Sequence, residues 1–122
     1  KDCVLGLTWR EKKQFPINYG VLFAFPGAVG LFETIWEGVK RRDEASRSWY
    51  ACQEAVLDLL PDLTLNRQPI VRHEHGNILM LKGSEYNYAP ESIEKATRDV
   101  SILHFKGERK RFMPEVFNRV FQ

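Results

Sequence analysis

A histidine, a glycine and a lysine follow one another at three-residue intervals near the end of the chain, at His104, Gly107 and Lys110. A neutral imidazole can ligate a divalent cation, and a glycine lets the backbone approach a phosphate with no side chain in the way. A lysine beside them would neutralise phosphate charge at close range. An apolar run from Val100 to Leu103 precedes them, and we expect it to be a strand. The pattern predicts a binding site for a metal ion and a diphosphate at the end of a strand.

The same segment can also be interpreted as a solvated basic turn. Its basic residues face a single acid, Glu108, and they are Lys106, Arg109, Lys110 and Arg111. A patch of this kind suits phosphate, but it could equally contact nucleic acid or an acidic partner in a non-catalytic binding module. Because short motifs have a high false-positive rate, the interpretation depends on other parts of the chain.

Four segments together resemble, in their order, the C-terminal part of nucleotide-sugar glycosyltransferases with the GT-A fold, particularly the retaining galactosyltransferases and glycogenins. The signature His-x-x-Gly-x-x-Lys is matched by His104, Gly107 and Lys110. The matches elsewhere are less complete: Phe15 to Phe23 is similar to the family's Phe-Asn-x-Gly-Val strand, Cys52-Gln53 to its Asp-Gln helix segment, and Leu81 to Tyr88 to its Leu-Pro-x-x-Tyr-Asn-Tyr element.

This resemblance implies transfer of a sugar from a nucleoside diphosphate sugar to a hydroxyl acceptor, with Mn2+ or Mg2+ as cofactor. His104 would be a metal ligand, and Gly107 and Lys110 would hold the diphosphate. Asn18 with Gly20 and Asn87 would bind substrate, and Gln53 would act at the transferred sugar as the catalytic residue. From the pattern alone, Gln53 has two interpretations, since an amide beside a buried helical stripe either needs a partner such as a sugar hydroxyl or faces solvent.

The chain also departs from the family. Cys52 stands where an aspartate is expected, the Pro-Trp that commonly follows the lysine is replaced by Arg111-Phe112, and the metal-binding Asp-x-Asp motif is absent from the sequence. We therefore expect the chain to be the acceptor-side, C-terminal part of a larger enzyme or a degenerate relative. An upstream nucleotide-binding half would supply the carboxylates, and the isolated chain would be inactive.

Length and composition predict one folded domain over residues 1–122. Apolar residues make up 43% of the chain and charged residues 28%, which excludes a disordered or fibrous chain. A net charge of +2 is too small to require nucleic acid as a partner. The chain has no apolar run of membrane-spanning length and no signal sequence, so we expect a cytoplasmic location.

The apolar spacing predicts an α/β domain with a mixed sheet and flanking helices, and the resemblance implies that this domain is of GT-A type and incomplete. Strands are expected over 3–9 and 19–25, and a hairpin at Gly76-Asn77 joins runs over 69–75 and 77–81. Helices are expected from Ala28 to about Arg42, from a Ser46 cap to Pro61, and over the closing stripe that starts at Phe112.

Several side chains have simpler expected roles. Phe32, Trp36 and Trp49 should pack in the core, and Cys3 and Cys52 should be free, buried thiols. His73 and His75 lie on one face of an extended run. A zinc site would need at least one further histidine or cysteine at ligand spacing, and the sequence offers none.

Overall fold

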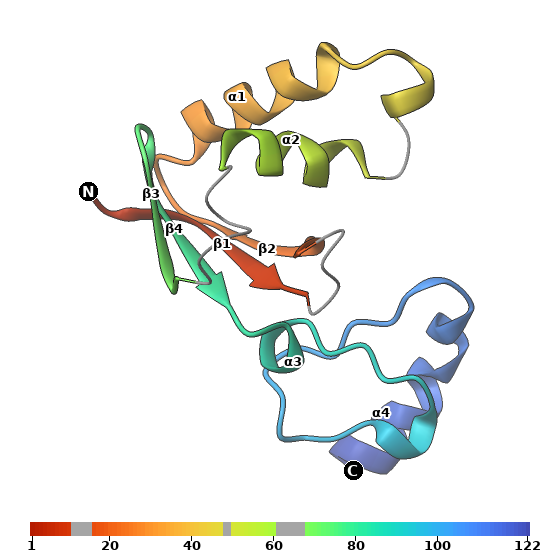
Figure 1. The fold of residues 1–122 in the computed structure, drawn as a ribbon. Helices are drawn as coiled ribbons and strands as arrows, with labels where there is room; N and C mark the ends of the chain where they lie inside the picture. Colours follow the sequence, from red (N-terminus) through yellow and green to blue (C-terminus); the bar gives the residue numbers. More distant parts are fainter. Residues whose placement is uncertain (11–15, 48–49, 61–67) are drawn as a thin grey trace. The chain divides into compact units, whose positions relative to one another are not determined.

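The structure, a computed structural model, describes residues 1–10, 16–47, 50–60 and 68–122. The chain divides into two compact units, Lys1–Leu81 and Lys82–Gln122. The first contains a sheet and two helices, and the second consists of helices of at most nine residues joined by irregular segments (Figure 1).

The sheet of the first unit is mixed. Its strands are β1 (Cys3–Trp9), β2 (Ile17–Ala24), β3 (Ile70–His73) and β4 (Gly76–Leu81), arranged in the order β2-β1-β4-β3. β1 pairs antiparallel with β2 and parallel with β4, whereas β3 and β4 form an antiparallel hairpin. The predicted α/β class with a mixed sheet is therefore confirmed.

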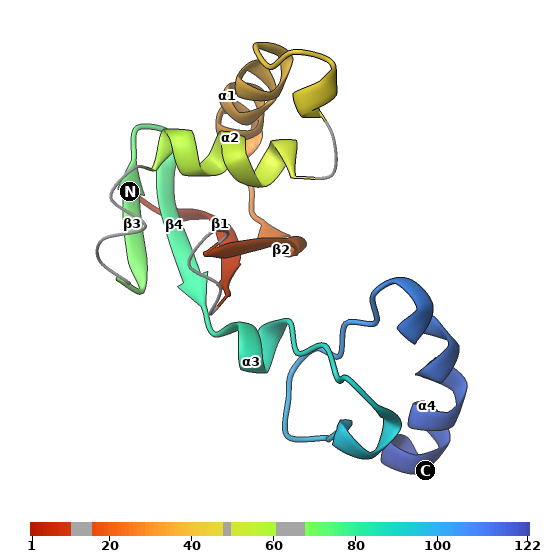
Figure 2. The ribbon, with the colours of Figure 1, turned by 45° about the vertical axis from the view of Figure 1, so that its right-hand side comes forward.

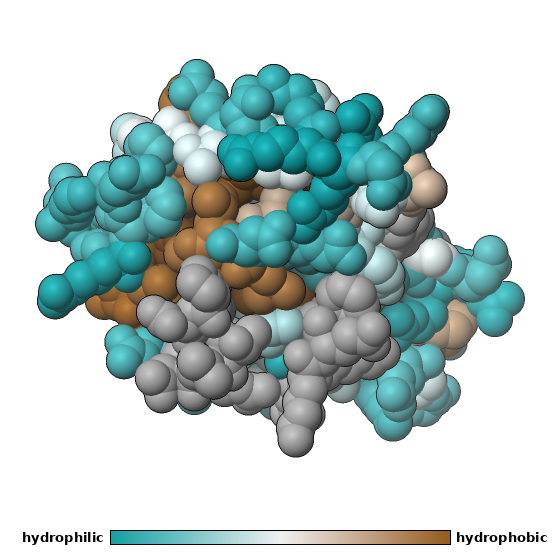
Figure 3. Space-filling view, turned by 45° about the horizontal axis from the view of Figure 1, so that its top comes forward, coloured by the Kyte–Doolittle hydropathy of each residue, from teal (hydrophilic) through white to brown (hydrophobic). Residues whose placement is uncertain are grey.

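Two helices, α1 (Val29–Lys40) and α2 (Ala51–Leu59), lie against the same face of this sheet (Figures 1 and 2). Their apolar positions form one cluster with the central strands, and its fully buried members include Leu5, Leu7, Leu31, Ile78 and Val56. The helical periodicity that predicted α1 is the spacing of Leu31, Ile35 and Val39, which face the sheet. Seen from the helix side, hydrophilic side chains cover much of the surface around a hydrophobic area (Figure 3).

Two details of these helices differ from expectation. Trp36 has an exposed fraction of 59%, because it lies next to Ile35 on the helix and therefore about 100° away from the buried stripe. Ser46 does not cap α2: it belongs to a short 3-10 turn, η1 (Ala45–Arg47), and Tyr50 is the residue before the helix. Trp49 lies outside the described residues, as does Pro61. Phe32 is partly buried against the core.

The hairpin turn falls at Glu74 and His75, two residues earlier than expected, and Gly76 is already the first residue of β4. Gly76 has φ +144°, and a Cβ atom added there would lie 2.5 Å from Cγ1 of Val4. The glycine is thus required by its backbone conformation and by the close approach of β1, and not by a two-residue turn centred on it.

The second unit contains α3 (Gly83–Tyr86), η3 (Ile93–Lys95), η4 (Gly107–Phe112) and α4 (Met113–Phe121). Val116 and Val120 of α4 pack with Ala96 and with partly buried apolar residues, which are Ile93, Leu103, Phe105 and Phe112. None of the described helices is both long and apolar enough to cross a membrane.

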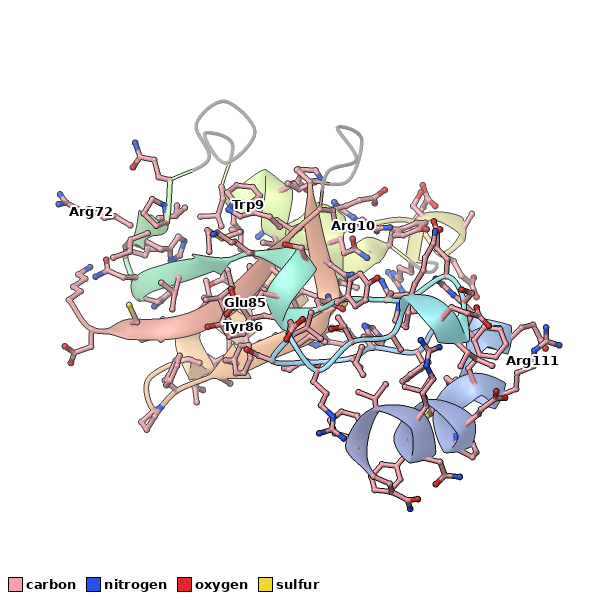
Figure 4. All side chains as sticks on the ribbon, turned by 90° about the horizontal axis from the view of Figure 1, so that it is seen from below. Trp9, Arg10, Arg72, Glu85, Tyr86 and Arg111 are labelled. Atoms are coloured by element: carbon pink, nitrogen blue, oxygen red, sulfur yellow. The ribbon has the colours of Figure 1, made fainter. Side chains whose placement is uncertain are left out.

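The strand expected over Val100–Leu103 is wrong. Only Leu103 makes a β-bridge, an isolated parallel pair with Tyr88. The amides of Ser101 and Ile102 donate instead to the carbonyl oxygen of Glu85, at 2.9 and 3.2 Å. Because these two amides donate to a helical residue of α3, they are not available to pair with a neighbouring strand, and the apolar run does not become part of a sheet. Glu85 and Tyr86 are labelled on α3 in Figure 4.

Candidate functional site

The second unit brings two predicted site residues into contact. The Nδ1 atom of His104 lies 2.6 Å from Oδ1 of Asn87. Backbone bonds hold the two residues in place, since the amide of His104 donates to the carbonyl oxygen of Tyr88 at 2.8 Å. The amide of Asn87 donates to the carbonyl oxygen of Gly83 at 3.1 Å. Asn87 is buried and His104 half-buried, so the contact is shielded from bulk water.

This contact fixes the tautomer of His104. A side-chain carbonyl oxygen can only accept, so Nδ1 must be the protonated nitrogen and Nε2 carries the lone pair. Burial lowers the pKa of His104, and the positive charges of Lys106, Arg109 and Lys110 lower it further. The imidazole is therefore neutral at neutral pH, with Nε2 as the ligating or accepting atom.

Three of the basic residues after His104 lie in the short 3-10 helix η4, namely Arg109, Lys110 and Arg111, and Lys106 precedes it. Gly107 has φ +53°, and a Cβ atom added there would meet nothing within 4 Å, so the backbone has open space above it. The side chain of Arg109 is held by backbone groups of its own unit: Nη1 donates to the carbonyl oxygens of Ala89 at 3.4 Å and Pro90 at 3.2 Å. Lys110 is exposed. Arg109 is therefore held by two backbone carbonyls, whereas the side chain of Lys110 is open to solvent.

Arg111 is arranged differently from Lys110. Its guanidinium carbon lies 5.4 Å from the ring centroid of Phe112, and Figure 4 shows the side chain extending away from η4. A cation that already stacks on an aromatic face is partly engaged. Lys110 and Arg111 thus differ in their surroundings, and only Lys110 belongs to the His-x-x-Gly-x-x-Lys signature.

The described residues do not make a complete site for manganese or magnesium. Among them, no group of three or more His, Cys, Asp or Glu side chains is placed to hold a metal ion. These hard cations prefer oxygen ligands, and carboxylates above all. His104 fits as one ligand through Nε2, but carboxylates from outside the described residues would have to provide the rest.

In the first unit, Asn18 and Gly20 build a wide bulge in the edge strand β2. Leu7 of β1 pairs with Leu22, whereas its neighbour Thr8 pairs with Asn18, so three residues of β2 have no counterpart on β1. The side chain of Asn18 holds this bulge, since its Oδ1 accepts from the amide of Gly20 at 2.9 Å. Such bulges redirect side chains and are common next to functional sites.

Gln53 is buried on α2, with an exposed fraction of only 8%, which excludes the solvent-facing alternative. Its Oε1 atom is fully buried and has no hydrogen-bond partner among the described residues. Leaving a buried carbonyl oxygen unpaired costs roughly 1 to 3 kcal/mol. A native structure rarely keeps such an atom without a reason, and a bound hydroxyl is one.

Tyr19, within the bulge, lies close enough to Cys52 of α2 for the two side chains to interact electrostatically. Burial raises the pKa of Tyr19 to about 12, and Cys52 contributes to the same effect. Tyr19 is therefore neutral at neutral pH. Cys52 is exposed, contrary to expectation, while Cys3 is half-buried, and both thiols are free. The aspartate expected at position 52 would thus have been placed at the surface beside Tyr19.

The predicted site residues therefore fall into two groups. Asn18, Gly20 and Gln53 belong to the first unit, and the second group consists of Asn87, His104, Gly107 and Lys110. Sequence reasoning counted Arg109 only as part of the basic patch, and it did not single out Tyr19. The supporting role of Arg109 gave no signal because its partners are backbone carbonyls nineteen or twenty residues away. Tyr19 could have been found, since it lies inside the Asn-x-Gly pattern.

A hollow of about 540 Å3 lies elsewhere, at the end of the β3–β4 hairpin, and is lined by Lys1, Arg72, His73, Glu74 and Asn77. It includes no predicted site residue, and Figure 4 shows Arg72 pointing away from the sheet. The rings of His73 and His75 are 5.4 Å apart, and the amide of His75 donates to Nδ1 of His73 at 3.3 Å. That bond occupies the lone pair of one imidazole nitrogen.

Comparison with known proteins gives no family for the chain. No protein-family profile matches it, and neither does any curated protein or solved structure.

Proposed function

We propose that this chain forms the acceptor-side part of an enzyme that transfers a sugar from a nucleoside diphosphate sugar to a hydroxyl acceptor. The observation that carries the proposal is the bond between His104 and Asn87. It presents the lone pair of Nε2 from a neutral, half-buried imidazole, next to a glycine with open space above it and an exposed lysine.

The charges around His104 favour an anionic ligand. Lys106, Arg109 and Lys110 all lower its pKa, so their positive potential reaches the imidazole. A diphosphate gains negative charge as the bond to the sugar breaks. Cations fixed in place before that step stabilise the transition state more than the bound donor, and they therefore lower the barrier. Arg109, held on two carbonyls, keeps η4 in the conformation that presents Lys110.

Taken by itself, the first unit has neutral polar groups that suit an uncharged, hydroxyl-bearing ligand. The buried Oε1 of Gln53 accepts hydrogen bonds and cannot donate them, so it matches a hydroxyl or an amide N–H. Tyr19 adds a neutral phenol in the neighbouring bulge. Asn18 uses its oxygen to hold that bulge, which gives it a supporting role beside any contact with sugar.

The proposal is tested by isothermal titration calorimetry of the 122-residue chain with uridine diphosphate and with inorganic diphosphate, each with and without manganese. We expect diphosphate binding that manganese strengthens, because the diphosphate oxygens can themselves ligate an ion that Nε2 of His104 also binds. His104→Ala should remove the manganese-dependent gain and leave the rest. His73→Ala, the control, should behave as the parent chain because His73 is not one of the predicted site residues and its Nδ1 already accepts from the amide of His75. Identical binding by the parent chain with and without manganese would exclude His104 from a metal site.

A second candidate, a basic binding module for nucleic acid or an acidic partner, is favoured by one observation. The described residues bring no carboxylate cluster to His104, so nothing there requires a metal. In that case η4 would act through its charge alone. The two functions differ in how individual charges contribute, and the comparison of Lys110 with Arg111 in the Discussion separates them.

A further inference from the structure

Helix α4 carries a row of apolar side chains that its own unit leaves uncovered. Met113, Phe117 and Phe121 have exposed fractions of 51%, 58% and 53%. They follow one another at four-residue intervals, so they lie on one side of the helix. The rings of Phe117 and Phe121 touch, with centroids 5.8 Å apart.

The row is not the face that α4 uses for folding. Val116 and Val120 are the residues that pack into the core of the second unit. On a helical projection they lie beside the row, displaced by about 60 to 100° from Phe117. The apolar face of α4 is therefore wider than the part of it that packs into the core. One half of it holds the helix in place, and the other half faces outward.

The charges next to the row are mainly positive. From Gly107 to the C-terminus the basic residues are Arg109, Lys110, Arg111 and Arg119, and the acidic ones are Glu108 and Glu115. Glu115 lies on the side of α4 opposite Phe117, as does Arg119, so these two offset each other away from the row. Lys110 and Arg111 lie three and two residues before Met113, in the turn that leads into the helix. An occupant of the row would therefore meet positive charge at the start of the helix.

We propose that α4 binds to the surface of an anionic lipid bilayer, with the row inserted at the level of the headgroups. A helix that combines exposed phenylalanines with adjacent lysine and arginine is suited to this interface. The row belongs to a single nine-residue helix, so it is convex and narrow. A stable protein partner would need a far larger complementary surface, whereas a bilayer accepts a convex ridge.

The test is co-sedimentation of the 122-residue chain with two kinds of vesicle, pure phosphatidylcholine and phosphatidylcholine containing roughly a third phosphatidylserine. We expect binding to the anionic vesicles that weakens with salt, and little binding to the neutral ones. Replacing both Phe117 and Phe121 by Ser should weaken the vesicle partition at least about tenfold. Phe25→Ser removes a comparably exposed phenylalanine of the first unit and should have no effect.

Folding of the double variant is checked by circular dichroism, and Val116 and Val120 remain to hold the helix. Phe117→Trp offers a second readout, since its emission should shift to shorter wavelength and be quenched by brominated lipid. Equal binding of the parent chain and the double variant would overturn the proposal. So would a dimer that the double variant abolishes, or tighter binding of an acidic amphipathic peptide than of anionic vesicles, because the row would then be a protein interface.

Discussion

The side-chain oxygen of Asn87 accepts a hydrogen bond from Nδ1 of His104, at 2.6 Å, across seventeen residues of sequence. Each residue was assigned a role from a different motif, one as a metal ligand and the other as a sugar contact. The contact gives Asn87 a role beside the one expected, because its oxygen orients the imidazole. A group that fixes the tautomer of a ligating histidine acts through that histidine.

Replacing Asn87 by Ala should therefore weaken manganese-dependent binding of uridine diphosphate by about tenfold, because the imidazole loses the partner that keeps its proton on Nδ1. Calorimetry measures the affinity, and the nitrogen chemical shifts of the imidazole report the tautomer. Asn118→Ala on the exposed side of α4 is the control. A tautomer unchanged in Asn87→Ala would contradict the proposed positioning.

The unpaired oxygen of Gln53 leads to a prediction about stability. Methionine has a similar shape and only a weakly accepting thioether sulfur, so Gln53→Met should raise the free energy of unfolding by about 1 kcal/mol in the absence of ligand. Urea unfolding measures the change. Gln68→Met, at an exposed position, should leave stability nearly unchanged. A clear loss of stability in Gln53→Met would mean that its oxygen is satisfied in the folded chain.

Local patterns in the sequence predicted most of the first unit. Strand β1 and helix α1 each have an apolar spacing that matches their buried positions, and the mixed sheet follows from two strands, two helices and a hairpin in that order. Trp36 shows where this reasoning fails: the apolar spacing indicates which side of the helix is buried, but it does not indicate how wide the buried face is. An aromatic residue next to the stripe can face solvent.

The parts that depended on distant contacts could not be predicted. The run Val100–Leu103 is apolar and β-branched enough for a strand, but pairing requires a neighbour, and its amides are taken by Glu85. The bulge at Asn18 depends on the register of β2 against β1, which periodicity does not encode when three residues are inserted. The partner of His104 likewise became known only from the fold.

The raised pKa of Tyr19 predicts a loss of stability at high pH. Its pKa is about 12 in the folded chain, against an ordinary value near 10, so the folded state binds more protons between these values. The free energy of unfolding should therefore fall as the pH rises from 10 to 12, and Tyr19→Phe should lack that part of the decrease.

Urea unfolding of both proteins across this pH range measures the difference, and tyrosinate absorbance follows the titration itself. In Cys52→Ser the pKa of Tyr19 should move back toward 10, because Cys52 is the second cause of the shift. Parallel stability curves for the parent chain and Tyr19→Phe would show that the phenol is as accessible to water as in the unfolded chain.

Lys110 and Arg111 separate a defined diphosphate site from a diffuse basic patch. If Lys110 neutralises a diphosphate at a fixed place, Lys110→Ala should weaken binding of uridine diphosphate about tenfold or more. Arg111→Ala should have little effect, since Arg111 extends away from η4 over the ring of Phe112.

In a diffuse patch each lost charge would weaken binding by a similar amount, and the salt dependence would decrease in step with the number of charges removed. Titrations of both variants at two salt concentrations, with uridine diphosphate and with an oligonucleotide, therefore give opposite patterns. Equal losses at the two positions, together with tighter binding of the oligonucleotide, would assign η4 to a basic binding module and refute the glycosyltransferase proposal.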